Sequence, residues 1–249
     1  MRCFHGKTSI GGRDKGIATV VERRNFADET NMNSTQLLEP ASTQRSRHPV
    51  ETPLENGEHL TVVEFLTRYE AAKDLRKCQL IEGTVHMPSP VRADFHAEPD
   101  NLLQGWIFSY AIRNPGLKAY TNATLLLDQE NAPQPDAILC TAPKAHHRVW
   151  LNKKGYLCGS PELVCEISAS TRSIDMHEKK RAYRRAGISE YLVWLTEENS
   201  VAWFHLTAGD YQLLPTTKGL IHSKIFPGLV LDTKALLKRD GAKLVAALG

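Results

Sequence analysis

The stretch PELVCEIS, residues 161–168, is typical of a core β-strand, yet it carries a carboxylate close to its middle. Leu163, Val164 and Ile167 are common core-strand residues, whereas Glu166 interrupts them. Burying an unpaired carboxylate costs several kcal/mol, so a chain avoids it unless another group compensates the charge. The fold of this region therefore depends on what compensates Glu166.

Apolar runs on both sides of this strand predict alternating helices and strands. Helices are expected at about 59–72 with Thr61 as N-cap, at 93–113, and from Ser173 to Ala186 with a stop at Gly187. Strands are expected within 77–87, 117–128, 136–140, 161–168, 190–195, 200–206, 210–214 and 226–232, and residues 141–160 are expected to form a loop. This order predicts an α/β fold with a mixed central β-sheet flanked by helices.

The two ends of the chain look different from its middle. Residues 1–55 mix both charge signs without a sustained period, which predicts a disordered N-terminal tail. Met32 is an alternative start of the natural protein. Residues 56–240 are expected to form the folded domain, and 241–249 a C-terminal tail.

Composition and cysteine spacing argue against a membrane protein, a disulfide-bonded protein and a zinc-binding protein. The chain has 249 residues, 41% of them hydrophobic, and a net charge of +3, which by itself does not indicate a nucleic-acid binder. No apolar run approaches the roughly 18–20 residues that span a bilayer, so no membrane partner is expected. The five cysteines form no CxxC pair, which favours a reducing cytoplasm without disulfides or a zinc site.

Two acids precede or interrupt apolar strands. Asp136 follows PQP and opens the run AILC, and Glu166 lies within LVCEI. Carboxylates on neighbouring strands could together hold Mg²⁺, which prefers carboxylate and water oxygens. The alternative is a buried glutamate that is paired with an arginine or capped by backbone groups.

The helix after this strand carries a lysine on its inward side. At about 100° per residue, Lys179 lies within the stripe formed by Met176, Ala182, Tyr183 and Ala186. Asp175 lies one turn earlier, so an ordinary i,i+4 ion pair between Asp175 and Lys179 is the alternative explanation for this inward lysine.

Basic residues are frequent along the same helix. The segment 172–185 carries six positive and two negative side chains. It could approach a phosphate backbone, or it could be a solvated helix face.

Two acids and a lysine at one end of a sheet match the needs of phosphodiester hydrolysis. A metal lowers the pKa of a bound water and neutralises the scissile phosphate. A lysine adds a positive point charge for the attacking water or the developing transition state. We expect Glu166 at the open edge of the sheet, facing Asp136 across a cation, with Lys179 reaching back from the helix.

The sequence resembles the Uma-type restriction endonucleases of the PD-(D/E)XK nuclease superfamily, over residues 58–237. The resemblance is carried by a histidine at position 96 and by the stretches LIEGTVHMPSPVR, LLLDQENAPQPDAILC, GYLCGSPELVCEISAST, YRRAGISEYLVW and FPGLVLD. It implies a restriction-endonuclease-like core in which Asp136 and Glu166 bind the metal. The superfamily usually has lysine where this chain has Ser168, and the Uma-type pattern places it on the next helix, at Lys179.

Other residues have supporting roles in this resemblance. The family usually has glutamate where this chain has Gln79, and Glu82 lies three residues later, on the opposite face of the strand. Glu82 or Gln79 is expected to complete the metal shell. His96 matches the family's histidine at the start of the long helix. Ser168, Asp175 and Tyr183 complete the set expected to support the site.

The resemblance implies an endonuclease that needs Mg²⁺ or Mn²⁺ and acts on nucleic acid, with double-stranded DNA as the expected partner. A homodimer would suit an enzyme that cuts two strands, although no residue specifies one. Gln79 favours an alternative, in which an impaired nuclease serves as a nucleic-acid or protein interaction module. A third option, a hydrolase of other phosphoesters, has no phosphate-binding loop to support it.

Overall fold

The computed structural model describes residues 52–75, 77–87 and 92–249. Most of the expected N-terminal tail, and with it Met32, lies outside the described residues. Among the described helices, none is both long and apolar enough to cross a membrane.

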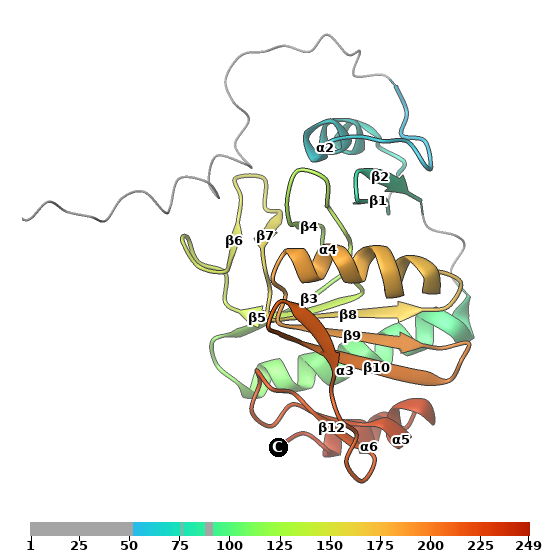
Figure 1. Cartoon of the computed structure of the whole chain (residues 1–249), viewed down its shortest axis with the longest axis vertical. Helices are drawn as coiled ribbons and strands as arrows, with labels where there is room; N and C mark the ends of the chain where they lie inside the picture. Colours follow the sequence, from blue (N-terminus) through green and yellow to red (C-terminus); the bar gives the residue numbers. More distant parts are fainter. Residues whose placement is uncertain (1–51, 76, 88–91) are drawn as a thin grey trace, which may run out of the picture.

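A six-stranded sheet forms the centre of the molecule (Figure 1). Its spatial order is β11-β10-β9-β8-β5-β3; only β8 and β9 are parallel, and the other neighbours are antiparallel. The strands are β3 (Leu117–Thr121), β5 (Ala137–Thr141), β8 (Leu163–Ser168), β9 (Glu190–Leu195), β10 (Ser200–Thr207) and β11 (Asp210–Leu213). The mixed sheet between helices confirms the predicted α/β class.

Strand β8 is the PELVCEIS stretch, and it is an interior strand whose six residues are all buried. The expectation that Glu166 lies at an open edge of the sheet is therefore wrong, because neighbours β5 and β9 cover both sides of β8. Strand alternation turns Leu163, Cys165 and Ile167 to one face, and Val164 and Glu166 to the other.

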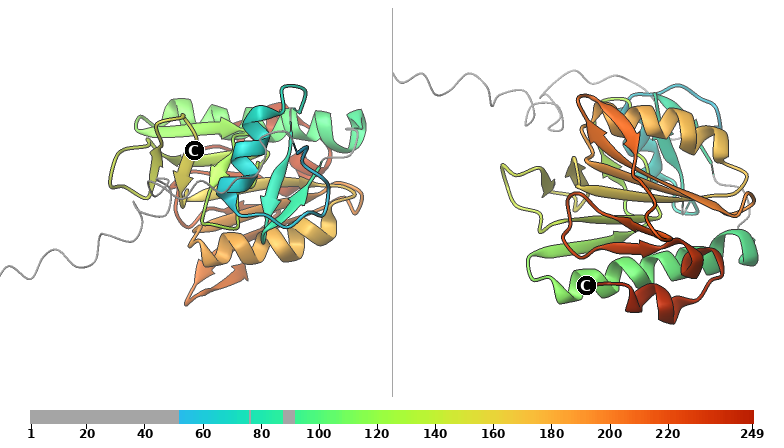
Figure 2. Two further views of the ribbon diagram at one scale, coloured as in Figure 1. Left: turned by 90° about the horizontal axis from the view of Figure 1, so that it is seen from above. Right: turned by 60° about the horizontal axis from the view of Figure 1, so that its bottom comes forward.

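Helix α3 and the C-terminal elements cover the first face of the sheet (Figure 2). Trp106 of α3 meets Trp203 of β10 edge to face, with 5.8 Å between the ring centroids. The expected C-terminal tail is instead helical, because Leu244 and Leu248 are buried in this core. The elements of this layer are η1 (Ala93–Ala97), α3 (Glu98–Arg113), β12 (Leu220–His222), β13 (Val230–Asp232), α5 (Thr233–Leu237) and α6 (Gly241–Ala246).

The segment between β8 and β9 covers the opposite face. It consists of the π-helical turn η2 (Ile174–Lys179) followed by α4 (Lys180–Arg185). A parallel strand pair needs a crossover connection, so the chain must return over the sheet directly after β8. Tyr183 of α4 packs edge to face on Tyr191 of β9, 5.1 Å between centroids, which fixes the helix above Glu166.

An N-terminal layer with its own core lies beside α4 (Figure 1). The capping box of Thr61 with Glu64 confirms the predicted start of α2. Residues 141–160, expected to be a loop, include two strands of three residues each, too short to give an alternation pattern. The layer consists of α2 (Val62–Ala71), β1 (Gln79–Ile81), β2 (Thr84–His86), β4 (Leu125–Leu126), β6 (Val149–Leu151) and β7 (Leu157–Gly159).

Gly159→Ala tests the tight contact between β6 and β7. Gly159 has φ +95°, and a Cβ there would lie 2.1 Å from the backbone oxygen of Arg148. We expect the free energy of unfolding to fall by more than about 2 kcal/mol, measured by urea denaturation. The control Gly187→Ala has φ +75° but nothing within 4 Å, so it should cost only about 1 kcal/mol. Equal costs at the two sites would contradict this account of the contact.

Candidate active site

The register between β5 and β8 brings the two predicted metal ligands together. Ala137 pairs with Cys165 and Ile138 with Val164, so continuing the antiparallel register by one residue places Asp136 opposite Glu166. Asp136 Oδ2 accepts a hydrogen bond from the backbone N–H of Ile167 at 2.7 Å. Two acids distant in sequence therefore meet at the start of β5.

Glu166 is compensated by two groups of the following helix. Its Oε2 lies 2.9 Å from Lys179 Nζ, and its Oε1 accepts a 2.6 Å hydrogen bond from the Tyr183 hydroxyl. Burial raises the pKa of Glu166 to about 7, although Lys179 opposes the shift; the nearby charges of Asp136 and Asp175 raise it further. The ionised form of Glu166 therefore depends on Lys179 and on the Tyr183 hydroxyl.

Lys179 is held between two carboxylates. Only 5% of its side chain is exposed, and Nζ lies 3.1 Å from Asp175 Oδ1 as well as 2.9 Å from Glu166. The hydroxyl of Thr171 donates to Asp175 Oδ2 at 2.6 Å and fixes that acid. Burial would lower the pKa of Lys179, but Asp175 and Glu166 raise it well above its usual value, so the ammonium is charged.

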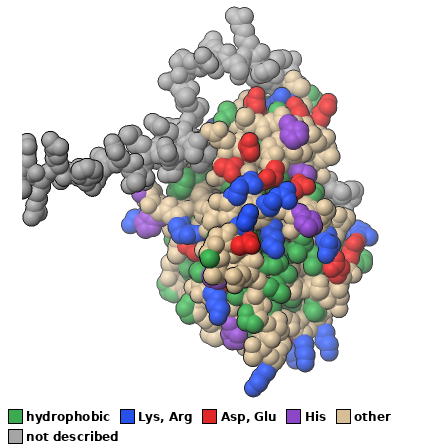
Figure 3. Space-filling model, viewed as in Figure 1, with side chains coloured by type: hydrophobic (Ala, Val, Ile, Leu, Met, Phe, Trp, Pro, Cys, Tyr) green, Lys and Arg blue, Asp and Glu red, His purple; other side chains and the backbone are tan. Residues whose placement is uncertain are grey.

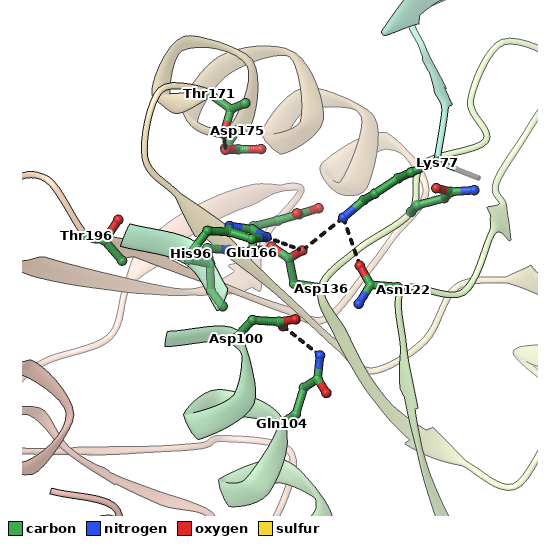
Figure 4. Close-up of polar contacts among 12 residues, drawn as sticks. Lys77, His96, Asp100, Gln104, Asn122, Asp136, Glu166, Thr171, Asp175 and Thr196 are labelled. Atoms are coloured by element: carbon green, nitrogen blue, oxygen red, sulfur yellow. Dashed lines mark hydrogen bonds and ion pairs between the residues drawn. The ribbon is translucent and has the colours of Figure 1, made fainter. Parts of the chain in front are cut away.

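Asp136 has cationic or hydrogen-bonding groups on both sides (Figure 4). Its Oδ1 lies 3.5 Å from His96 Nε2 and 3.5 Å from Lys77 Nζ. Burial alone would raise the pKa of Asp136, but the hydrogen bond with His96 and the charge of Lys77 hold it below its usual value. The same interaction raises the pKa of His96.

These groups line a pocket of about 370 Å³ between the N-terminal layer, the sheet and η2. The N-terminal layer contributes Lys77, Gln79 and His86 to its wall. The predicted residues that line it are Gln79, His96, Asp136, Glu166, Asp175 and Lys179.

Three predicted residues lie outside the lining. Glu82 is in the β1–β2 turn with φ +51°, and its carboxylate pairs with Arg185, so the structure does not bring it to the pocket. Tyr183 does not line the pocket, and its hydroxyl donates a hydrogen bond to the carboxylate of Glu166. Ser168 is buried at the end of β8, and its hydroxyl has no hydrogen-bond partner among the described residues.

Lys77 and His86 line the pocket but were not among the site residues predicted from the sequence. His86 Nε2 lies 3.6 Å from Glu178 Oε2, and burial lowers the pKa of His86. Both residues lie in the N-terminal layer, far along the chain from the acids. Lys77 and Gln79 are two residues apart, with the buried Cys78 between them, and this alternation was the available signal.

The donor set fits a divalent cation with a preference for oxygen. No cluster of three or more His, Cys, Asp or Glu that could hold a metal occurs among the described residues, so the protein would supply two carboxylates. Mg²⁺ is commonly bound by one or two carboxylates, with water and substrate phosphate completing its shell. Asp136 and Glu166 each fix one oxygen by a hydrogen bond and turn the other toward positive charge. Both would hold the ion.

Lysine and arginine side chains gather on the face of the molecule over α4 (Figure 3). Arg181 and Arg185 are exposed there, and Arg184 is half-buried. Arg184 pairs with Asp210, and Arg185 with Glu82, so part of this charge is neutralised within the protein.

Lys179→Met tests whether the ion pair compensates Glu166. The substitution leaves two buried acids without their cation, so we expect the free energy of unfolding at neutral pH to fall by about 3–5 kcal/mol in urea denaturation. Lys180→Met, which removes an ammonium 3.6 Å from the Phe204 ring centroid, is the control and should cost about 1 kcal/mol. Equal losses would show that the buried contacts add nothing.

Comparison with known proteins agrees with this architecture. A crystal structure described as "a putative nuclease belonging to DUF820 from Anabaena variabilis ATCC 29413" has a TM-score of 0.54 at 15% identity, covering 72% of this chain and 98% of that one. At this identity the likeness shows the fold alone, and it confirms the restriction-endonuclease-like core. No curated protein matches the chain with significant similarity.

The family model Uma2, described as "Putative restriction endonuclease", matches residues 62–234, more than half of the chain. This match confirms the resemblance drawn from the motifs. The protein belongs to the Uma2 family of restriction endonuclease-like nucleases.

Proposed function

We propose that this protein is a metal-dependent endonuclease that hydrolyses phosphodiester bonds in DNA. Asp136 and Glu166 bind Mg²⁺ or Mn²⁺, and Lys179 stabilises negative charge in the transition state. Gln79, His96 and Asp175 complete the wall of the site, and Tyr183 supports Glu166 from within the fold, whereas Ser168 is left without a role because its hydroxyl has no hydrogen-bond partner among the described residues. Glu82 is left out because its carboxylate pairs with Arg185 outside the pocket.

One observation supports this proposal above all. A lysine that is 5% exposed bridges two buried acids, and a third acid, directly before the neighbouring strand β5, lines the same 370 Å³ pocket. A purely structural salt bridge could be replaced by apolar residues at little cost to stability. Charges gathered around a pocket instead suit a reaction that moves charge.

The contacts of the site assign different roles to the metal and to Lys179. A bound divalent cation lowers the pKa of a water molecule and neutralises the phosphate. The Lys179 ammonium is fixed by Glu166 and Asp175, so it offers a preorganised positive charge to the attacking water or the phosphoryl oxygens. Thr171 and Tyr183 hold the two acids and hence the lysine.

Gln79 favours a second candidate, an interaction module without catalysis. Gln79 lines the pocket as a neutral amide, and its Oε1 accepts a weak 3.4 Å hydrogen bond from the backbone N–H of Gln134. It adds no negative charge to the metal shell. The two candidates differ in whether two carboxylates suffice.

Duplex DNA as the substrate, a homodimer and a cytoplasmic location belong to the same proposal. The basic residues over α4 would give sequence-independent contacts with a phosphate backbone.

Plasmid nicking tests the catalytic proposal. We expect supercoiled DNA to be cleaved in Mg²⁺ or Mn²⁺ and left intact in EDTA. Glu166→Gln removes a metal ligand, and Lys179→Met removes the fixed positive charge. Each should lower the rate at least about 100-fold, as loss of one preorganised electrostatic group does. Lys243→Met, an exposed lysine of α6 on the other side of the sheet, should leave the rate unchanged.

Unchanged cleavage in both site variants would refute the site assignment. DNA binding without cleavage by the wild type would support the interaction module instead. Circular dichroism of each variant separates loss of activity from loss of folding, and Glu166→Gln, which keeps the size and polarity of the side chain, is the milder substitution.

A further inference from the structure

Lys77 reaches the candidate active site from the N-terminal layer, on the side of Asp136 away from His96 (Figure 4). Its Nζ lies 2.8 Å from Asn122 Oδ1 and 3.5 Å from Asp136 Oδ1. We propose that Lys77 binds a phosphate oxygen of the nucleic-acid substrate beside the scissile bond. This inference rests on the proposed function and assigns a phosphate-binding residue within the same pocket.

The two lysines of the pocket differ in how strongly neighbouring carboxylates neutralise their charge and in how exposed they are. Lys179 is 5% exposed and pairs with two acids at 2.9 and 3.1 Å. Lys77 is 32% exposed and approaches one acid, at 3.5 Å. An entering anion therefore meets the charge of Lys77 in a more accessible and less neutralised form.

The uncharged side chain of Asn122 holds the Lys77 ammonium in place. Asn122 follows β3 with φ +49°, a left-handed conformation that asparagine tolerates better than most residues. Its backbone N–H donates to the backbone oxygen of Asp136 at 3.3 Å, which ties this turn to the start of β5. The amide oxygen accepts one N–H of Lys77 and fixes the ammonium without cancelling its charge.

The ammonium keeps donor capacity for a ligand. A lysine has three N–H donors, and Asn122 takes one of them. The 3.5 Å distance to Asp136 is longer than the 2.7–2.9 Å of a strong charge-assisted hydrogen bond. A phosphate oxygen near Asp136 could therefore be bound without breaking a strong contact.

Lys77 could instead serve only to hold Asp136. That carboxylate is already fixed, because its Oδ2 accepts the Ile167 N–H at 2.7 Å and its Oδ1 faces His96. The two roles give different results. A phosphate-binding residue contributes to the salt dependence of DNA binding, whereas a residue that only holds Asp136 contributes to metal affinity.

The salt dependence of DNA binding tests the inference. Fluorescence anisotropy of an end-labelled DNA duplex in Ca²⁺ would be measured between about 50 and 200 mM KCl for wild type, Lys77→Met, Lys77→Arg and the control Lys243→Met. Loss of one phosphate contact lowers the slope of log K against log salt by about 1. We expect this loss in Lys77→Met and not in Lys77→Arg or Lys243→Met. Mn²⁺ affinity, measured by calorimetry without DNA, should not fall in Lys77→Met.

An unchanged slope in Lys77→Met would overturn the inference, and so would a loss of Mn²⁺ affinity without a change of slope. Neither result would affect the proposed nuclease activity, provided the wild type cleaves plasmid. A wild type that neither binds nor cleaves DNA would refute the proposed function, and the inference with it. Lys77 is partly exposed, and circular dichroism of Lys77→Met would show whether the substitution leaves the fold intact.

Discussion

The contact between Lys179 and Glu166 is the interaction on which the centre of this protein depends. Glu166 lies on an interior strand where an unpaired carboxylate would cost several kcal/mol. The Lys179 ammonium and the Tyr183 hydroxyl compensate the buried carboxylate, and Asp175 holds the lysine in place. Burial, together with the charges of Asp136 and Asp175, still raises the pKa of Glu166 to about 7.

Topology explains why this contact can form. Strands β8 and β9 are parallel, so the chain that leaves β8 must cross back over the sheet before β9 begins. The crossing helix covers the same face as Glu166, which puts Lys179 over the strand that it has just left. On the other side, antiparallel pairing with β5 brings Asp136 opposite. One parallel and one antiparallel neighbour thus assemble the three groups.

The N-terminal layer converts this cluster into a pocket. It adds Lys77, Gln79 and His86 as a wall opposite η2. Three acids, Asp136, Glu166 and Asp175, then face two lysines, which leaves one negative charge for His96 or a metal to offset. The site therefore combines a strongly neutralised lysine with an accessible one, and the two are suited to different tasks.

The sequence by itself determined the α/β class, the order of the main elements and the acid–acid–lysine pattern, because these depend on local periodicity and spacing. It also indicated Thr61 as the N-cap of α2, and the structure adds Glu64 to this cap. Only the tertiary structure decided that Glu166 is interior, that Glu82 turns to Arg185, that residues 241–249 are packed, and that Lys77 meets Asp136. Strand order and contacts between distant segments follow from packing of the whole chain, which no local pattern records.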